Sequence, residues 1–371
     1  MGEHRAQKNQ QGQPQRGALA PSHTGDDLVG AAVVGHAAHT VAEQEVSTRQ
    51  SGFKIKKIPS YILNFKAYFK YFLQRRNTQK YSQVNNLSLR DFDGFRQQFI
   101  ISHPTIYSKQ SIMDNPPEAD AYICGSDQIW GGSTVYYLPF VPKGKIKIAY
   151  APSFGGTNPF TTPNSSELYK LLSDFDFIGI REESGANLLH EHGFKNAIQV
   201  VDPTLLLNKN LYLGLISKEH SNNNDVFIYL LGNEISCSID DIFKFIKEKG
   251  WSYTYVASQG RIDRYNKVQA TIPQWINHIS NSKVVITNSF HCVVFALIFH
   301  KPFIFLPLSG EFARMNDRLY DLLDKTDLKS QIYNDDFNSI PLNIEFLKFD
   351  SYRENQTKKT TDILNSLLSC R

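Results

Sequence analysis

The chain has 371 residues, of which 41% are hydrophobic and 12% aromatic, enough to build two globular domains with sizeable cores. Its net charge of +4 at pH 7 is too small to indicate nucleic-acid binding, no apolar run reaches the roughly 18 residues that cross a membrane, and the N-terminus lacks the apolar segment of a signal peptide. The four cysteines are scattered without metal-ligand spacing, which is typical of reduced thiols in a cytoplasmic protein.

Residues 1–52 differ from the rest of the chain in composition. They contain no aromatic residue and no isoleucine, so they can bury little apolar surface on folding. We expect this segment to be disordered or to be a non-native N-terminal extension.

A basic stretch follows at residues 54–80, where eight lysines and arginines occur without a single acid. Apolar side chains recur there at helical spacing, so residues 60–76 are predicted to form a basic amphipathic helix. One interpretation is peripheral contact with an anionic membrane surface or with a lipid-phosphate acceptor. The other is a helix packed on its own domain with its lysines in solvent.

Strands and helices alternate through the next part of the chain. The predicted strands span residues 120–124, 145–150, 177–180 and 198–201, and the predicted helices span residues 88–99, 165–172 and 181–189. This alternation predicts an α/β domain with a parallel sheet, which we assign to residues 53–207.

A second α/β unit follows a polar linker. The linker is assigned to residues 208–225, the second domain to residues 226–350, and a closing helical segment that packs back on the first domain to residues 351–371. The second unit's predicted strands span residues 226–231, 253–257, 284–287 and 303–305, and the helices from here to the C-terminus span residues 238–247, 272–281, 293–298, 311–323 and 361–368. Neither a G-x-G-x-x-G motif nor a phosphate loop of the Walker type occurs, so no nucleotide cofactor is indicated.

Small polar or charged residues follow each predicted strand of the first domain, at the edge where ligands bind in open α/β sheets. They are Ser126, Asp127, Ser153, Arg181 and Asp202. Arg181 opens a helix directly after a strand and suits a phosphate or carboxylate ligand, the alternative being a salt bridge with Glu182, Glu183 or another acid. Asp127 suits a general base or a partner of a sugar hydroxyl, unless it caps the following turn. Asp202 precedes a proline and is more typical of a turn.

The stretch from Lys283 to Phe305 organises the second unit, because it combines a buried strand, a polar corner, a helix and another buried strand. The corner contains Asn288, Ser289 and His291. Histidine is the one residue type in this corner whose side chain ordinarily titrates near neutral pH, so we expect any chemistry to lie close to His291. The alternative is a core histidine with satisfied hydrogen bonds.

Five segments together resemble the bacterial polysaccharide pyruvyl transferase family. They are ICGSDQIW (residues 123–130), KIAYAPSFG (147–155), IREESGANLL (180–189), VVDPTLLL (200–207) and ITNSFHCVVFALIFHKPF (286–303). Each segment alone is weak evidence, but the five in this order and spacing are specific. The resemblance runs from about Phe53 to the C-terminus.

The resemblance implies two Rossmann-like domains that face each other across a cleft, similar to GT-B glycosyltransferases. It implies an enzyme of exopolysaccharide biosynthesis that moves the enolpyruvyl group of phosphoenolpyruvate onto two hydroxyls of a sugar, in a polysaccharide or its lipid-linked precursor, and forms a pyruvate ketal. No cofactor or metal beyond this donor substrate is implied, and the expected location is the cytoplasm, at the inner face of the membrane. His291 matches the family's proposed acid, and Arg181 matches its arginine for phosphoenolpyruvate.

The chain departs from the family's pattern in two places. Relatives have Arg-Leu-His where this chain has Ser289-Phe290-His291, so one expected arginine is absent, and we expect Asn288, Ser289 and backbone N–H groups, or another cation such as Arg314, to replace it. The family's first strand, glycine loop and helix are not recognisable in residues 1–52. Two alternatives therefore stand beside the transferase: a GT-B-like glycosyltransferase that uses a nucleotide sugar, and a truncated, inactive member that acts as a binding protein.

Overall fold

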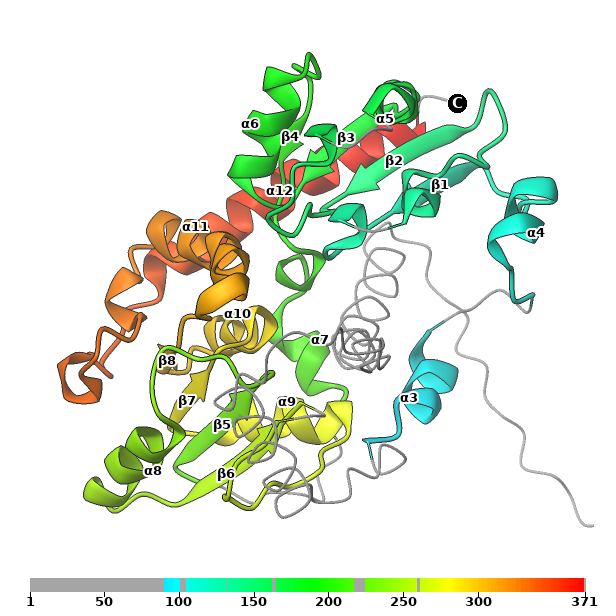
Figure 1. Ribbon diagram of the computed structural model, residues 1–371. Coiled ribbons are helices and arrows are strands. Elements are labelled where there is room, and N and C mark those ends of the chain that lie inside the picture. Colours follow the sequence, from blue (N-terminus) through cyan, green and yellow to red (C-terminus); the bar gives the residue numbers. More distant parts are fainter. Residues whose placement is uncertain are drawn as a thin grey trace, which may run out of the picture.

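The structure, a computed structural model, describes residues 90–100, 105–131, 133–161, 165–216, 224–258 and 261–369. The predictions for residues 1–52 and for the basic helix within residues 54–80 lie outside these ranges. The described part of the chain forms two units, each built on a four-stranded parallel sheet with helices around it (Figure 1). This confirms the predicted α/β architecture.

The first sheet has the strand order β1-β2-β3-β4, so each strand pairs in parallel with the next one along the chain. The strands are β1 (Ala121–Cys124), β2 (Ile146–Tyr150), β3 (Phe177–Ile180) and β4 (Ile198–Gln199). Every residue of β2 is buried, as expected for a central parallel strand covered on both faces. Its one charged residue, Lys147, places its Nζ 4.4 Å from the ring centroid of Phe175.

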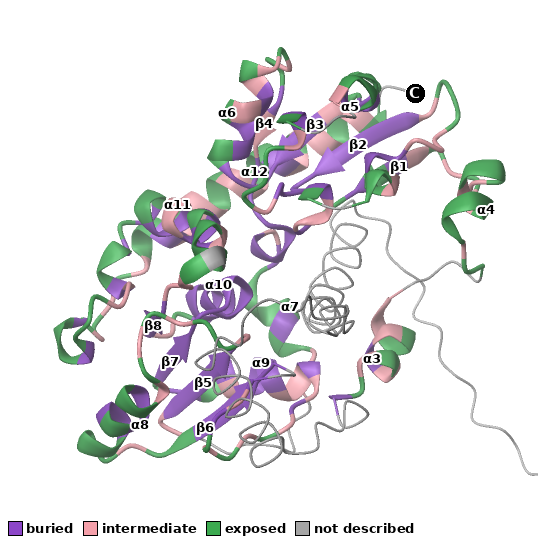
Figure 2. Cartoon of the chain, viewed as in Figure 1, coloured by how far each residue is buried: buried purple, intermediate pink, exposed green. Residues whose placement is uncertain are grey.

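The second sheet has the order β6-β5-β7-β8 and is also fully parallel. Its strands are β5 (Val226–Leu230), β6 (Tyr253–Ala257), β7 (Val284–Thr287) and β8 (Phe303–Phe305). All nine residues of α10 (Phe290–Ile298) are buried, which Figure 2 shows as a purple helix at the centre of the molecule. A helix that is hydrophobic all round is stable only inside a core, and α10 therefore lies at the heart of the second unit.

The remaining helices cover the two sheets and connect them. They are α3 (Phe92–Phe99), α4 (Lys109–Asp114), α5 (Ser165–Ser173), α6 (Glu183–Glu191), α7 (Lys209–Leu213), α8 (Ile239–Glu248), α9 (Ile272–Asn281), α11 (Asp317–Lys325) and α12 (Leu347–Ser369). Short 3-10 helices occur at η2 (Ile129–Gly131), η3 (Thr134–Tyr137), η4 (Pro159–Thr161), η5 (Pro203–Leu205), η6 (Gly310–Asn316), η7 (Lys329–Gln331) and η8 (Phe337–Ser339).

Two segments pack differently from what the sequence predicted. The helix α3, which we assigned to the first domain, buries Phe95 in the core of the second unit, and the neighbouring Arg90 donates to the carbonyl of Ala257 at 2.7 Å. The predicted linker contains α7, whose Tyr212 is fully buried in the same core. Aromatic side chains explain both differences, because they gain more from burial in the larger core than from exposure beside a small sheet.

Two predicted helices also have different bounds. The predicted helix at residues 311–323 is a 3-10 helix, η6, followed by α11. The closing helix is longer than predicted, because α12 begins at Leu347. Its first turns bury Phe349 in the second unit, whereas Leu364 and Leu367 pack under the first sheet, as predicted for a helix that returns to the first domain.

Candidate active site

Loops after four parallel strands of the first unit bring polar side chains to one edge of the sheet. Ser126 and Asp127 follow β1, Ser153 follows β2, and Arg181 and Asp202 follow β3 and β4. The loop after β1 needs glycine at its start, because Gly125 has φ +134° and a Cβ there would lie 1.8 Å from the carbonyl oxygen of Tyr150. This close approach holds the loop against the end of β2.

Arg181 is the centre of a buried ionic cluster, which we define as Asp127, Arg181, Asp202, His291 and Arg318. Its guanidinium lies 3.1 Å from the Asp202 carboxylate and 3.4 Å from that of Asp127, and it also donates to the Ser126 hydroxyl. The alternative interpretation of Arg181, a salt bridge with an acid, is thus observed, although with Asp127 and Asp202 instead of its sequence neighbours. The side chain is only 2% exposed.

Arg318 joins the cluster from the second unit. It belongs to α11, and its Nη1 lies 3.3 Å from the same Asp127 oxygen that faces Arg181. Both guanidinium groups also lie over the ring of Phe290, at 5.5 Å for Arg181 and 5.1 Å for Arg318. Such stacking stabilises two cations that would otherwise only repel each other.

The second guanidinium of the cluster belongs to Arg318, whereas Arg314, the cation that the sequence suggested, lies outside the cluster. Arg314 is exposed in η6, one turn earlier, and its Cβ lies close to Gly156 of the first unit. A Cβ at Gly156 would lie 2.9 Å from the Cβ of Arg314. The two units therefore pack closely at this junction, and glycine leaves room for Arg314.

Burial and the paired charges shift the protonation equilibria of the cluster in opposite directions. Burial disfavours the charged form of Asp127, but the guanidinium groups of Arg181 and Arg318 outweigh it and lower the pKa of the carboxyl. Burial, together with the neighbouring charge of Arg181, lowers the pKa of the Arg318 guanidinium. For the adjacent Glu182 burial dominates and raises the pKa of the carboxyl, although Arg318 and Arg181 act against it.

His291 enters the cluster from the first turn of α10. The residue is 1% exposed, and its Nε2 lies 3.6 Å from the Asp202 carboxylate, which is beyond hydrogen-bond distance. Neither Nδ1 nor Nε2 has a hydrogen-bond partner within the described ranges. The alternative of a core histidine with satisfied hydrogen bonds is therefore not what the structure shows.

Buried polar atoms without partners concentrate at this cluster. Nine such side-chain atoms occur in the part of the chain that the structure describes, and five of them belong to Arg181, Glu182, Arg318 and His291. Because unpaired buried polar groups are unfavourable, their accumulation at one place makes this cluster the candidate site.

Three predicted site residues serve the local backbone in this structure. Asn288 bonds both the N–H and the carbonyl of Leu231, at 2.7 and 2.8 Å. The Ser289 hydroxyl caps α10 by accepting from the Cys292 N–H at 3.4 Å, and the Ser153 hydroxyl accepts from the Gly155 N–H at 3.0 Å. These contacts fix the loops next to Arg181, which follows β3, and next to His291, which lies in the first turn of α10.

Two residues of the cluster were not predicted to bind a ligand, because the sequence favoured a turn for Asp202 and gave no indication for Arg318. Asp202 follows a strand end like the other candidates, so its position was the available signal, and its Oδ1 does also cap the turn by accepting from the Thr204 N–H at 3.0 Å. Arg318 had no such signal, because α11 follows no strand directly and only the tertiary fold turns this residue toward the first unit.

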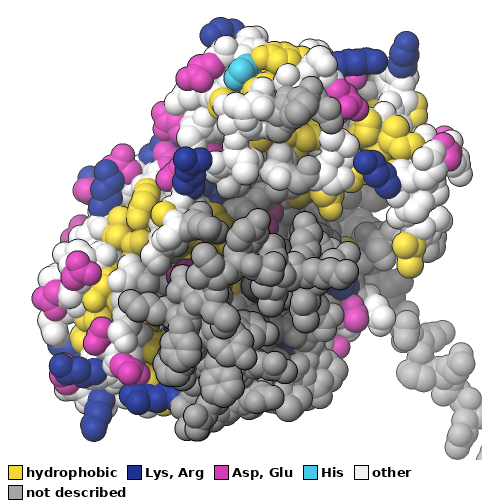
Figure 3. Space-filling model, viewed as in Figure 1, with side chains coloured by type: hydrophobic (Ala, Val, Ile, Leu, Met, Phe, Trp, Pro, Cys, Tyr) yellow, Lys and Arg dark blue, Asp and Glu magenta, His cyan; other side chains and the backbone are white. Residues whose placement is uncertain are grey.

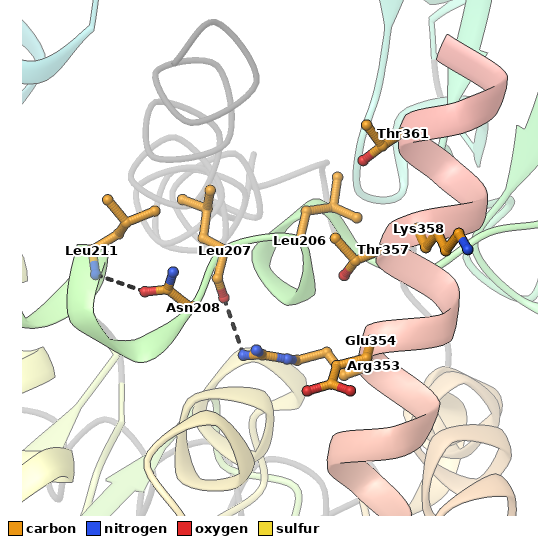
Figure 4. Close-up of a pocket in the computed structure, with 9 residues that line it drawn as sticks. All are labelled: Leu206, Leu207, Asn208, Leu211, Arg353, Glu354, Thr357, Lys358 and Thr361. Carbon is orange, nitrogen blue, oxygen red and sulfur yellow. Dashed lines mark hydrogen bonds between the residues drawn. The ribbon is translucent and has the colours of Figure 1, made fainter. Parts of the chain in front are cut away.

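A cavity among the described residues lies elsewhere. It has a volume of about 450 Å³ and separates α12 from the segment that links the units, with Leu206, Leu207, Arg353 and Thr357 among its lining residues (Figure 4). Arg353 donates across it to the Leu207 carbonyl at 3.3 Å. None of the cluster residues lines this cavity. We therefore base the candidate site on the polar side chains around His291 and not on the cavity.

Other kinds of site are not indicated by the described residues. Among them, no group of three or more His, Cys, Asp and Glu side chains is arranged to hold a metal ion. No helix within the described ranges combines the length and the apolar character needed to cross a membrane. Acidic and basic side chains are interspersed on the face drawn in Figure 3.

Comparison with known proteins gives one family and one solved structure. Residues 23–310 match the family described as Polysaccharide pyruvyl transferase. The match begins inside the segment that we predicted to be disordered or non-native, earlier than the motifs suggested, and it ends before Arg318. The solved structure is that of UDP-GlcNAc 2-epimerase from Neisseria meningitidis bound to UDP-GlcNAc, with 12% identity, a TM-score of 0.43, and coverage of 80% of this chain and 94% of that chain. No curated protein matches the chain.

Proposed function

Because the chain belongs to the polysaccharide pyruvyl transferase family and is thus a transferase, we propose that it uses phosphoenolpyruvate to form a pyruvate ketal on a sugar. The acceptor is two hydroxyls of a sugar in a cell-surface polysaccharide or in its lipid-linked precursor. One observation carries the proposal: a buried imidazole with both nitrogens unpartnered among the described residues lies beside two arginines from opposite units.

The arginine pair suits the donor. Phosphoenolpyruvate carries about three negative charges, and guanidinium groups bind phosphate and carboxylate oxygens through two parallel hydrogen bonds. Arg181 and Arg318 face one common oxygen, that of Asp127, so one anionic group of a ligand can contact both. The surrounding burial strengthens such contacts, because little water screens them.

His291 is the proposed general acid. The methylene carbon of the donor must receive a proton before the neighbouring carbon can be attacked, and a histidine is suited to deliver it near neutral pH. The Asp202 carboxylate, 3.6 Å from Nε2, places a negative charge beside the ring. The carbon that bears the phosphate then becomes an oxocarbenium ion.

The ketal forms in two additions. The first sugar hydroxyl attacks the oxocarbenium carbon and its proton returns to His291. The carbon–oxygen bond to phosphate then breaks, and the second hydroxyl attacks the same carbon and gives its proton to the departing phosphate. The products are a methyl-bearing cyclic ketal with one carboxylate and hydrogen phosphate, so atoms and charges balance.

The test is release of inorganic phosphate from phosphoenolpyruvate, measured with and without sugar or lipid-linked oligosaccharide acceptors, with the ketal identified by mass spectrometry. Replacement of His291 by alanine should lower acceptor-dependent turnover about 100- to 10,000-fold, the usual contribution of a general acid. His300→Asn is the matched control. His300 lies just beyond the other end of α10, is 40% exposed and pairs with Asp350 at 2.9 Å, so this variant should keep wild-type turnover.

Full activity of a folded His291→Ala protein would remove the role assigned to this residue. A nucleoside diphosphate that raises the melting temperature, with no response to phosphoenolpyruvate, would support a nucleotide-sugar glycosyltransferase instead.

A further inference from the structure

Asp127 occupies the space between the two arginines that the donor needs. One oxygen, Oδ1, lies 3.4 Å from Nη1 of Arg181 and 3.3 Å from Nη1 of Arg318. In this structure the carboxylate of Asp127 thus takes the position that an oxygen of a phosphate or carboxylate ligand would take.

Exposure increases within the cluster toward Asp127. The side chains of Asp202, Arg181 and His291 are 0%, 2% and 2% exposed, that of Arg318 is 6% exposed, and that of Asp127 is 12% exposed. An anion that approaches from solvent therefore meets Asp127 before it meets either arginine.

The loop that carries Asp127 holds it in an uncommon backbone conformation. Its φ is +70°, in the left-handed region that non-glycine residues adopt rarely, although aspartate tolerates it better than most. The loop is fixed on both sides, since the Asp127 carbonyl accepts from the Ser153 N–H at 2.7 Å and the Asp127 N–H donates to the Ser126 hydroxyl at 2.6 Å. A rotation of the side chain alone can therefore withdraw the carboxylate without moving the loop.

We propose that Asp127 is an internal anion that fills the donor's site in the resting enzyme and that the donor must displace. The proposal rests on the proposed function in assigning the displacing ligand as phosphoenolpyruvate. In the cluster the two positive charges of Arg181 and Arg318 are balanced by the two negative charges of Asp127 and Asp202. A negative group of the donor would replace Asp127 as the partner of the two arginines. Asp127 lowers the affinity for anions, and it keeps the arginines paired when no donor is bound.

The experiment is calorimetric titration of wild type and Asp127→Asn with inorganic phosphate and, separately, with phosphoenolpyruvate. Asparagine keeps the size of the side chain and removes the competing charge, so both ligands should bind about tenfold more tightly or better. The variant should also be less stable without ligand, because two buried guanidinium groups lose a partner, and phosphate should raise its melting temperature more than that of wild type.

Asp263→Asn is the control. Asp263 is another buried aspartate, 3.0 Å from Arg261, but it lies within the second unit away from the cluster, so this variant should lose stability without any gain in affinity. Equal or weaker anion binding by Asp127→Asn would overturn the proposal. If that result accompanies normal turnover of phosphoenolpyruvate by wild type, the proposed function stands alone. If phosphate binds more tightly to the variant but wild type turns over no phosphoenolpyruvate, the internal anion stands and the proposed function fails.

Discussion

At the scale of single residues, the two buried carboxyl groups of the site, Asp127 and Glu182, differ in how burial and the arginines shift their pKa values. The two arginines keep Asp127 ionised, whereas Glu182 beside them is left with an oxygen, Oε2, that has no partner among the described residues. Its other oxygen accepts from the Phe154 N–H at 3.1 Å. Glu182 is therefore a buried carboxyl that hydrogen-bonds to Phe154 and Ser153, and burial still raises its pKa.

This raised pKa predicts a pH-dependent effect of Glu182→Gln. A group whose pKa is higher in the folded protein than in the unfolded chain, where glutamate titrates at about 4.3, stabilises the fold at low pH and loses that contribution as pH rises through the folded value. Glutamine does not titrate, so the stability of the variant relative to wild type, measured by urea unfolding, should rise as the pH increases from about 4.3 through the raised pKa of folded Glu182. Glu354→Gln, on an exposed face of α12, controls for general pH effects. A relative stability that falls over this range would contradict the assignment.

At the scale of elements, the carboxyl edge of the second sheet is held by asparagine side chains. Asn288 binds the backbone of Leu231 after β5, and Asn316 binds the backbone of Leu308 after β8, in each case through both its oxygen and its nitrogen. These side chains replace ladder bonds where the strands have ended. They fix the corner from which His291 projects.

Asn288→Ala should therefore destabilise the protein by about 1–3 kcal/mol, because it leaves an N–H and a carbonyl of Leu231 without partners. Urea unfolding of the variant measures this loss. Asn281→Ala is the control. Asn281 is exposed at the end of α9, and its side chain hydrogen-bonds to Asn277 and Ser280 of the same helix. Equal stabilities of the two variants would refute the structural role of Asn288.

The sequence predicted elements well where hydrophobic patterns are strong. All eight strands that the structure describes were predicted, because runs such as Val284–Thr287 are almost entirely apolar. The start of α12 was missed because only Phe349 and Thr360 are buried along its 23 residues, so it shows little periodicity. In the site, strand-end positions pointed to Asp127, Arg181 and His291, but Arg318 depends on how α11 lies against the first unit, which no local pattern reports.

At the scale of the whole molecule, α11 joins the two units through charges. Besides the buried contact of Arg318 with Asp127, Lys325 lies 3.1 Å from Glu183 of α6, and Asp321 accepts from Gln199 of β4. The Lys325–Glu183 pair is 28% and 59% exposed, so water and salt screen it, whereas the Arg318–Asp127 pair is almost fully buried.

The two pairs should respond differently to salt. A double-mutant cycle on Lys325 and Glu183, measured by urea unfolding, should give a coupling energy below about 1 kcal/mol that disappears at about 1 M salt. The same cycle on Arg318 and Asp127 should give a larger coupling energy that persists. A salt-resistant coupling between Lys325 and Glu183 would show that this pair is less hydrated than its exposure indicates.

Helix α12 restricts how the two units can move apart. Its 23 residues make a rod of about 34 Å that is anchored in one unit by Phe349 and in the other by Leu364 and Leu367. The chain segment that links the units runs beside this rod, and Thr357 and Arg353 bond the carbonyls of Leu205 and Leu207. These anchors tie the two units together along one line, so we expect any relative motion of the units to be a rotation about α12 and not a free separation.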